Sequence, residues 1–148
     1  MRLQGSGVAT VAGMGRVRVG VARVPSRESP EEAVALVVGR GYDACEIDFE
    51  GGFWMDYPWA ERFGEVAREH DVALSVHAPL FGWVGHLEAS GRKWSSALGA
   101  LDRSAGIAAA CGAELVVFHP GFLLGRERVD AIDTVVDQLA LVRERLEG

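Results

Sequence analysis

Residues 72–79 read VALSVHAP and residues 115–121 read LVVFHPG. Each stretch is a short run of β-branched and aliphatic residues that ends in a histidine, with a proline one or two residues later. Such runs predict strands that end before the proline, because proline cannot donate a ladder hydrogen bond. Between them, residues 93–111 contain no proline and predict a helix that ends at Gly112, where a left-handed C-cap is expected. This order is typical of a βα repeat with parallel strands.

The same alternation of strand and helix runs through most of the chain. The first helix has an N-cap signature in Ser29, Pro30 and Glu32. We therefore expect an α/β fold of four βα units, with a parallel sheet and outer helices, over residues 16–148. A flexible glycine-rich arm is expected at residues 1–15. The expected strands are 17–21, 44–49, 72–77 and 115–119, and the expected helices are 30–39, 58–70, 93–111 and 127–146, the last with an apolar stripe of Val129, Ile132, Val136 and Leu139.

The composition is that of one globular domain. The chain has 148 residues, of which 49% are hydrophobic and 24% charged, with a formal net charge of -6. An acidic chain has no bulk attraction to nucleic acid or anionic membranes, so any phosphate site must be local. No apolar run reaches the roughly 20 residues that span a bilayer, and we expect a cytoplasmic protein. Cys45 and Cys111 form no CxxC motif and are expected to be reduced packing residues.

Alternation along the strands predicts which side chains face inward. Successive strand residues point to opposite faces, and in residues 44–50 three carboxylates alternate with three apolar side chains. An unpaired interior charge costs several kcal/mol, so we predict an ion pair between Arg18 and Glu46. For Asp48 and Glu50 two interpretations are open: a structural polar role and a role at a functional site. The same alternation predicts that Val17, Val19 and Val21 face the helices.

The two histidines at the strand ends are the strongest functional signal. Carboxyl ends of neighbouring parallel strands meet at one edge, about 4.8 Å apart, so His77 and His119 can share a metal ion. Neutral imidazole suits zinc, iron or manganese. Asp48 or Glu50 is the candidate for an additional oxygen ligand. The alternative is a pair of hydrogen-bonded histidines that line a polar barrel mouth.

Aromatic residues gather in the loops after the second and third strands. Trp54 lies in the first of these loops, and Phe81 and Trp83 lie in the second. Rings at one end of a sheet can stack on bases or on sugar faces. They can also pack on one another, and the sequence leaves both interpretations open.

The two histidine motifs and the helix between them resemble a known family. Ser75-Val76-His77-Ala78-Pro79, residues 92–112 and Val117-Phe118-His119-Pro120-Gly121 are similar to the first half of endonuclease IV, in the xylose isomerase-like TIM-barrel superfamily. The resemblance implies four units of a (β/α)8 barrel, a half-barrel, and zinc-dependent hydrolysis of DNA at abasic sites in base-excision repair. It implies that His77 and His119 bind zinc and that Leu80 and Phe81 present an apolar wedge to DNA. Trp54 and Trp83, from the aromatic cluster, are further candidate substrate contacts.

The same residues are compatible with two alternatives to the endonuclease function. The His77-Ala78-Pro79 motif is shared with sugar isomerases and epimerases, and Gly82-Trp83-Val84 replaces the asparagine-containing stretch of endonuclease IV. A small sugar as substrate, with zinc or manganese as cofactor, is therefore the alternative to abasic DNA. The third alternative is an inactive half-barrel, because two protein ligands leave a zinc site incomplete. An open half-barrel also exposes its edge strands, so we expect self-association.

Overall fold

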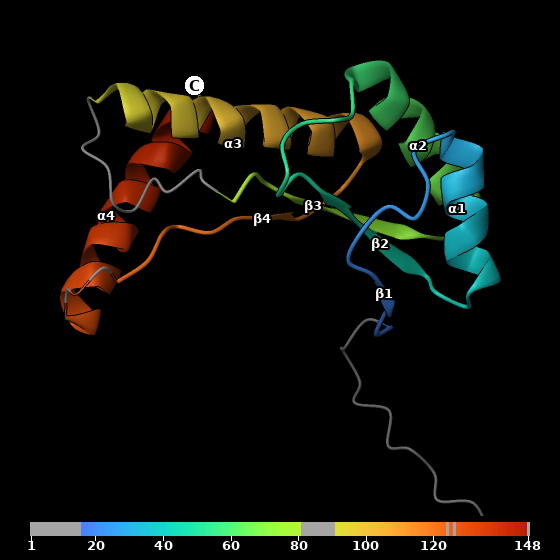
Figure 1. Ribbon diagram of the computed structural model, residues 1–148, viewed down its shortest axis with the longest axis horizontal. Helices are drawn as coiled ribbons and strands as arrows, with labels where there is room; N and C mark the ends of the chain where they lie inside the picture. The colour runs from blue at the N-terminus through green and yellow to red at the C-terminus, as the bar shows by residue number, and fades with distance from the viewer. Residues whose placement is uncertain (1–15, 81–90, 124, 126, 148) are drawn as a thin grey trace, which may run out of the picture.

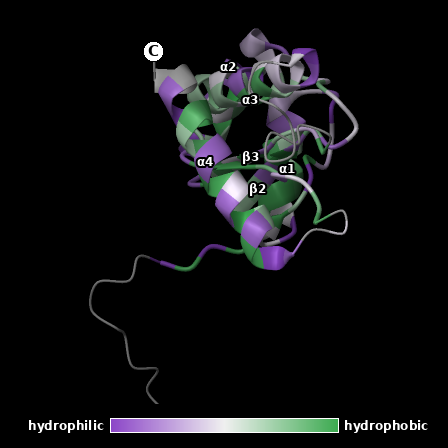
Figure 2. Ribbon diagram, turned by 90° about the vertical axis from the view of Figure 1, so that its left-hand side faces the viewer, coloured by the Kyte–Doolittle hydropathy of each residue, from purple (hydrophilic) through white to green (hydrophobic). Residues whose placement is uncertain are grey.

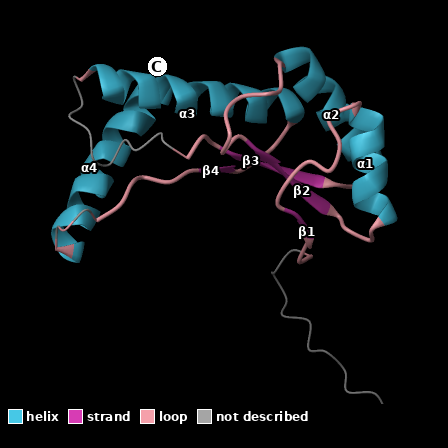
Figure 3. Ribbon diagram, in the orientation of Figure 1, coloured by secondary structure: helices cyan, strands magenta, loops and turns pink. Residues whose placement is uncertain are grey.

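The fold consists of four βα units in chain order. The computed structural model describes residues 16–80, 91–123, 125 and 127–147, with side chains as far as residue 144. The expected arm at residues 1–15 lies outside these residues. The helices form an arc around the sheet (Figure 1 and Figure 3). The elements are β1 (Gly20–Val21), α1 (Pro30–Gly39), β2 (Ala44–Asp48), α2 (Tyr57–Glu69), β3 (Ala73–His77), α3 (Arg92–Cys111), β4 (Val116–Val117) and α4 (Arg128–Glu147).

All four strands are parallel and lie in the order β1-β2-β3-β4. In this register Asp48 at the end of β2 lies opposite His77, and His77 lies opposite Val117 at the end of β4. The carboxyl ends of three strands therefore meet at one edge of the sheet. The predicted α/β fold with a parallel sheet is confirmed.

The first strand is shorter than the sequence predicts. β1 covers Gly20 and Val21 alone, and its ladder with β2 begins at the pair of Gly20 and Ala44. Before this ladder the two segments are joined at Asp43, whose backbone N–H donates to the Val19 carbonyl at 3.0 Å and whose carboxylate accepts from the Val19 N–H at 2.7 Å. Val17 and Val19 precede the ladder and are 75% and 60% exposed. The prediction that these two valines face the helices is wrong.

Local signals position the helix ends. The Ser29 hydroxyl accepts a hydrogen bond from the Glu32 backbone N–H at 3.1 Å, which confirms the predicted cap of α1. Gly112 ends α3 in the left-handed conformation with φ 72°, also as predicted. The cap of α2 was not predicted: the Asp56 carboxylate accepts from the backbone N–H of Trp59 at 3.0 Å.

The main core lies between the sheet and the first three helices. Cys45, Ile47 and Phe49 are at most 2% exposed, which confirms that the apolar face of β2 contacts the helices. A smaller cluster joins α3 to α4, and the indole N–H of Trp94 donates to Gln138 at 3.0 Å across it. The smaller cluster consists of Ala78, Trp94, Ala97, Leu101 and Val142.

The face of α4 that is buried against the rest of the fold differs from the predicted one. Val129, Ile132 and Val136 belong to the predicted apolar stripe, yet they are 68%, 51% and 58% exposed. Ala131 and Val142 are buried in their place, because the side of α4 that carries Gln138 and Val142 contacts α3. The apolar stripe of α4 is therefore left outside the core. Within the described part of the chain, no helix is long and apolar enough to cross a membrane.

Candidate metal centre

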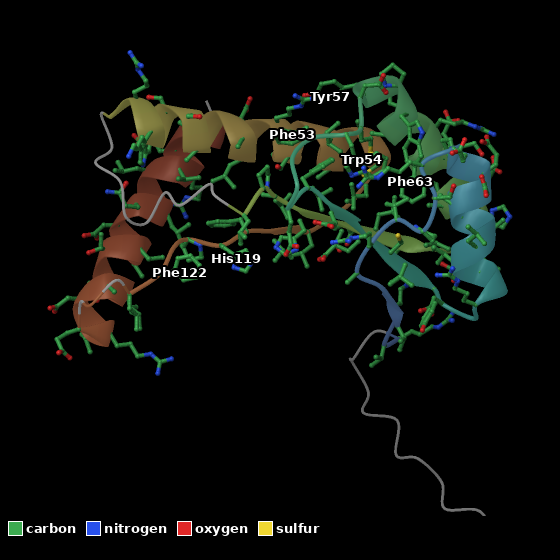
Figure 4. The ribbon with its side chains drawn as sticks, in the orientation of Figure 1. Phe53, Trp54, Tyr57, Phe63, His119 and Phe122 are labelled. Carbon is green, nitrogen blue, oxygen red and sulfur yellow. The ribbon has the colours of Figure 1, made fainter. Side chains whose placement is uncertain are left out.

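Three potential ligands meet at the carboxyl edge of the sheet. Glu50 follows β2, His77 is the last residue of β3, and His119 follows β4. One carboxylate oxygen and one nitrogen of each imidazole lie within 4.8 Å of one another. The two rings have centroids 5.2 Å apart and planes inclined by 32°. Figure 4 shows His119 on the segment that leaves β4. A single cation can bridge a carboxylate and two imidazoles at this separation.

A carboxylate on the neighbouring strand orients His77. The Nδ1 atom of His77 lies 3.2 Å from a carboxylate oxygen of Glu46, which stands on the inner face of β2. Nδ1–H donation to this acceptor leaves the lone pair on Nε2. Nε2 is buried and has no hydrogen-bond partner among the described residues. A buried imidazole nitrogen without a partner fits a metal ligand, since an unsatisfied buried polar atom is otherwise unfavourable.

Asp48 supports the loop that carries Glu50. One Asp48 oxygen accepts from Nε of Arg23 at 2.9 Å, and the other accepts from the Glu50 backbone N–H at 2.8 Å. The Asp48 backbone carbonyl accepts from the Trp54 indole at 2.9 Å. Asp48 is 7% exposed, and each oxygen of its buried carboxylate thus has a hydrogen-bond partner. The structure thus gives Asp48 a structural role and places Glu50 beside the histidines.

The predicted ion pair between Arg18 and Glu46 is wrong. Arg18 instead pairs with the Asp71 carboxylate at 2.7 Å, at the opposite end of the sheet. The register explains the difference, because Gly20 lies opposite Ala44 and Arg18 therefore precedes the β2 ladder. Glu46 lies farther along β2 and contacts His77. The Arg18 guanidinium holds the pKa of the Asp71 carboxyl below its usual value.

The aromatic residues described at this edge pack against one another. The Trp54 ring is 5.3 Å from the Trp59 ring and 6.3 Å from the Phe49 ring, centroid to centroid. The Arg27 guanidinium lies 4.3 Å from the Trp54 ring centre. Figure 4 shows Phe53, Trp54 and Phe63 in a row between the sheet and the helices α2 and α3. The packing interpretation therefore holds for Trp54, Leu80 is half-buried, and the predicted contacts Phe81 and Trp83 lie outside the described residues.

The donor set favours a metal that accepts oxygen and nitrogen ligands. Zinc, manganese and iron all bind carboxylate and imidazole together. Cys45 offers no sulfur ligand, because burial, followed by the charge of Glu46, raises the pKa of its thiol to about 12. Its side chain also lies on the helix-facing side of β2. The residues present therefore fit a divalent cation held by one carboxylate and two neutral imidazoles.

Sequence reasoning found most of this centre. It named His77 and His119, and it left Asp48 and Glu50 as equal candidates that only the loop geometry could separate. It assigned Glu46 to the wrong partner. Alternation along the strands had placed Glu46 and His77 on the inward side; the missing information was the strand register, in which the two lie two residues apart.

Comparisons with known proteins place this arrangement in context. A family model described as xylose isomerase-like TIM barrel matches residues 34–147. An uncharacterized protein of Methanocaldococcus jannaschii is 27% identical over 130 residues, which cover 87% of this chain and 46% of that protein. The crystal structure of a D-tagatose 3-epimerase-like protein superposes with a TM-score of 0.58 at 24% identity, over 81% of this chain and 46% of that one. The chain thus spans about half the length of these relatives.

Proposed function

Because the chain belongs to the xylose isomerase-like TIM-barrel family, we propose that it forms the metal-binding part of a divalent-metal-dependent sugar isomerase or epimerase. The observation that carries this proposal is the cluster of Glu50, His77 and His119, whose ligand atoms lie within 4.8 Å of one another. When bound there, the metal would polarise an oxygen of the substrate. The residues that hold the metal would be these three, with Glu46 positioning His77.

The charge around the cluster favours a small neutral substrate. Glu46, Asp48 and Glu50 lie at or beside the site, and the arginine in contact with this group, Arg23, already pairs with Asp48. The whole chain is acidic, with a net charge of -6. With a divalent cation bound, the charges of these four side chains and the metal sum to about zero, so the site offers a polyanion such as DNA no net attraction. A sugar needs only hydrogen-bond acceptors and a metal, both of which this edge of the sheet can supply.

A second candidate function is zinc-dependent cleavage of DNA at abasic sites. The observation in its favour is the pair of motifs around the histidines, His77-Ala78-Pro79 and Phe118-His119-Pro120-Gly121, which resemble endonuclease IV. Half-buried Leu80 follows the first motif directly, where that resemblance implies an apolar contact with DNA. This candidate needs a basic surface to hold the duplex. The described residues at the carboxyl edge of the sheet do not offer one, because Arg23 is already paired with Asp48 and Glu50.

One set of measurements separates the candidates. Metal-free protein is titrated with Zn²⁺ and with Mn²⁺ by calorimetry. The loaded protein is then incubated with a panel of ketoses and aldoses in D₂O and, separately, with a duplex that contains one abasic site. Formation of the isomeric or epimeric sugar, with or without deuterium at the carbon next to its carbonyl, supports the isomerase or epimerase, and strand cleavage supports the endonuclease. Metal binding without either reaction supports an inactive half-barrel, and absence of metal binding contradicts both enzymes.

The His119→Ala variant is the matched control. It removes one ligand from a segment outside the sheet ladder, so the strands keep their pairing. A reaction that depends on the proposed centre should fall to background in this variant. A reaction that continues at the original rate would show that it does not depend on the proposed centre.

A further inference from the structure

The exposed large apolar side chains gather at the two ends of the half-barrel. Among the described residues twelve such side chains are exposed, and eleven of them belong to the first or the last βα unit. Figure 1 shows α1 and α4 at opposite ends of the molecule. Tyr57 is the exception. The first end has Val17, Val19, Val38 and Tyr42, and the last end has Leu115, Phe122, Leu123, Val129, Ile132, Val136 and Leu141.

The last end also contains an apolar groove. It has a volume of about 240 Å³ and lies between the segment after β4 and the exposed stripe of α4. Pro120 and Leu123 line one side, and Ile132 and Val136 line the other. In Figure 2, α4 faces the viewer with apolar and polar segments side by side. An apolar surface of this kind on a monomer marks an interaction site.

The sheet is open at the same two ends. β1 and β4 are the outer strands, so each has one edge without a strand partner among the described residues. Open parallel edges are sites for pairing with another strand. All four strands point the same way, so a strand added at either end in this direction continues a parallel sheet.

The charges of the two ends favour contact between unlike ends. Residues 127–144 contain two arginines against five aspartates and glutamates, whereas three of the five arginines in residues 16–40 already pair with Asp43, Asp71 and Asp48 of the same chain. Contact between the first end of one molecule and the last end of another therefore avoids the repulsion between two acidic ends. Contact between two α4 helices would join like charges.

From these observations we propose that two copies of this chain associate about a two-fold axis, with the β4 and α4 end of each copy against the β1 and α1 end of the other. A two-fold rotation makes both contacts at once, which covers every apolar cluster described above and closes the arrangement without a free end. Four parallel strands from each copy give eight, the number in a closed (β/α)8 barrel. The two metal centres then lie around one shared mouth. This inference concerns assembly and does not depend on the proposed reaction.

The first test measures mass in solution. Sedimentation equilibrium of the wild-type chain, over a hundredfold range of concentration, should give twice the 15.9 kDa of one chain. Val38→Glu on α1 and Ile132→Glu on α4 should each weaken association by roughly 100-fold or more, because each places a charge in an apolar contact. Tyr57→Glu, which changes the exposed apolar residue away from both ends, should leave the mass unchanged. Circular dichroism confirms that each variant is folded.

The second test identifies which surfaces meet. Chains with Val38→Cys and chains with Ile132→Cys are mixed and treated with a short bis-maleimide. The native Cys45 and Cys111 are buried at 2% and 3% exposure and should not react. Cross-linked dimers should form in the mixture and not with either variant alone. A wild-type monomer, an open series of higher oligomers, or cross-linking of the Ile132→Cys chain to itself would overturn the proposal.

Discussion

The Nδ1 atom of His77 lies 3.2 Å from the Glu46 carboxylate on the neighbouring strand, and Nε2 of the same ring is buried without a partner among the described residues. One nitrogen of the ring is thereby committed to a structural contact, and the other is available to a ligand. This division of roles sets the tautomer before any metal binds.

Replacement of Glu46 by glutamine should weaken metal binding while the fold is kept. The amide is the same size, but it lacks the charge that holds the Nδ1–H tautomer, and the loss of such a partner typically lowers metal affinity by about 10–100-fold. Calorimetric titration with Zn²⁺ measures the affinity. Long-range ¹H–¹⁵N spectra of His77 should show a shift from the Nδ1–H form toward the Nε2–H form. Glu61→Gln, on the exposed side of α2, is the control and should change neither quantity.

Removal of any one of the three proposed ligands should abolish metal-dependent stabilisation. A ligand that binds only the folded protein stabilises it by RT ln(1 + [L]/Kd), about 2.7 kcal/mol at a hundred times Kd. The wild-type Tm should therefore rise with added Zn²⁺ or Mn²⁺, and Glu50→Gln, His77→Ala and His119→Ala should lose that rise. Asp48→Asn should keep part of the rise in Tm, since Asp48 does not bind the metal and only accepts a hydrogen bond from the Glu50 backbone N–H. Equal metal response in wild type and His119→Ala would contradict the centre.

Sequence patterns predicted the parts of this structure that depend on residues close together in the sequence. The caps at Ser29 and Gly112 depend on a few adjacent residues, and the histidines follow from where each strand ends. The pairing of Arg18 depends on strand register, in which Gly20 lies opposite Ala44 and Arg18 precedes the β2 ladder. One apolar stripe on α4 was visible in the sequence, but the described residues leave its Val129, Ile132 and Val136 exposed. Local patterns do not contain that information.

The ion pair between Arg18 and Asp71 should make stability depend on pH at the acid end. The hydrogen bond and the charge of Arg18 lower the pKa of Asp71 in the folded protein from its usual 3.8. A lowered folded pKa favours the ionised form, so the stabilisation is present above the unfolded value and is lost as pH falls through the folded one. The difference in unfolding free energy between wild type and Asp71→Asn should thus shrink as pH falls below about 4. Asparagine suits the positive φ of 54° at this position.

Denaturant titrations between pH 2.5 and pH 7 measure this difference. Asp102→Asn on the exposed side of α3 is the control, and its difference from wild type should not vary with pH in the same way. A constant difference between wild type and Asp71→Asn over the whole range would show that the Arg18 contact does not contribute to stability.

Two glycines in helices should respond in opposite directions to the same substitution. A Cβ atom at Gly64 in α2 would collide with the backbone of Cys111 at the end of α3, and backbone atoms cannot rotate away. Gly64→Ala should therefore push the two helices apart and lower the free energy of unfolding by about 1–3 kcal/mol. At Gly99 in the interior of α3, an added Cβ atom would meet no other atom within 4 Å. Gly99→Ala should raise the free energy of unfolding by about 0.5–1 kcal/mol, because alanine loses less conformational entropy in a helix.

Urea unfolding of both variants at one fixed protein concentration tests the pair, since association makes apparent stability depend on concentration. The close approach of α2 to α3 matters for the site as well, because both helices pack against β3, the strand that carries His77. Gly64→Ala should consequently lower metal affinity along with stability, whereas Gly99→Ala should leave metal affinity unchanged. If both alanines stabilised the protein, the two helices would have to lie farther apart than this packing allows.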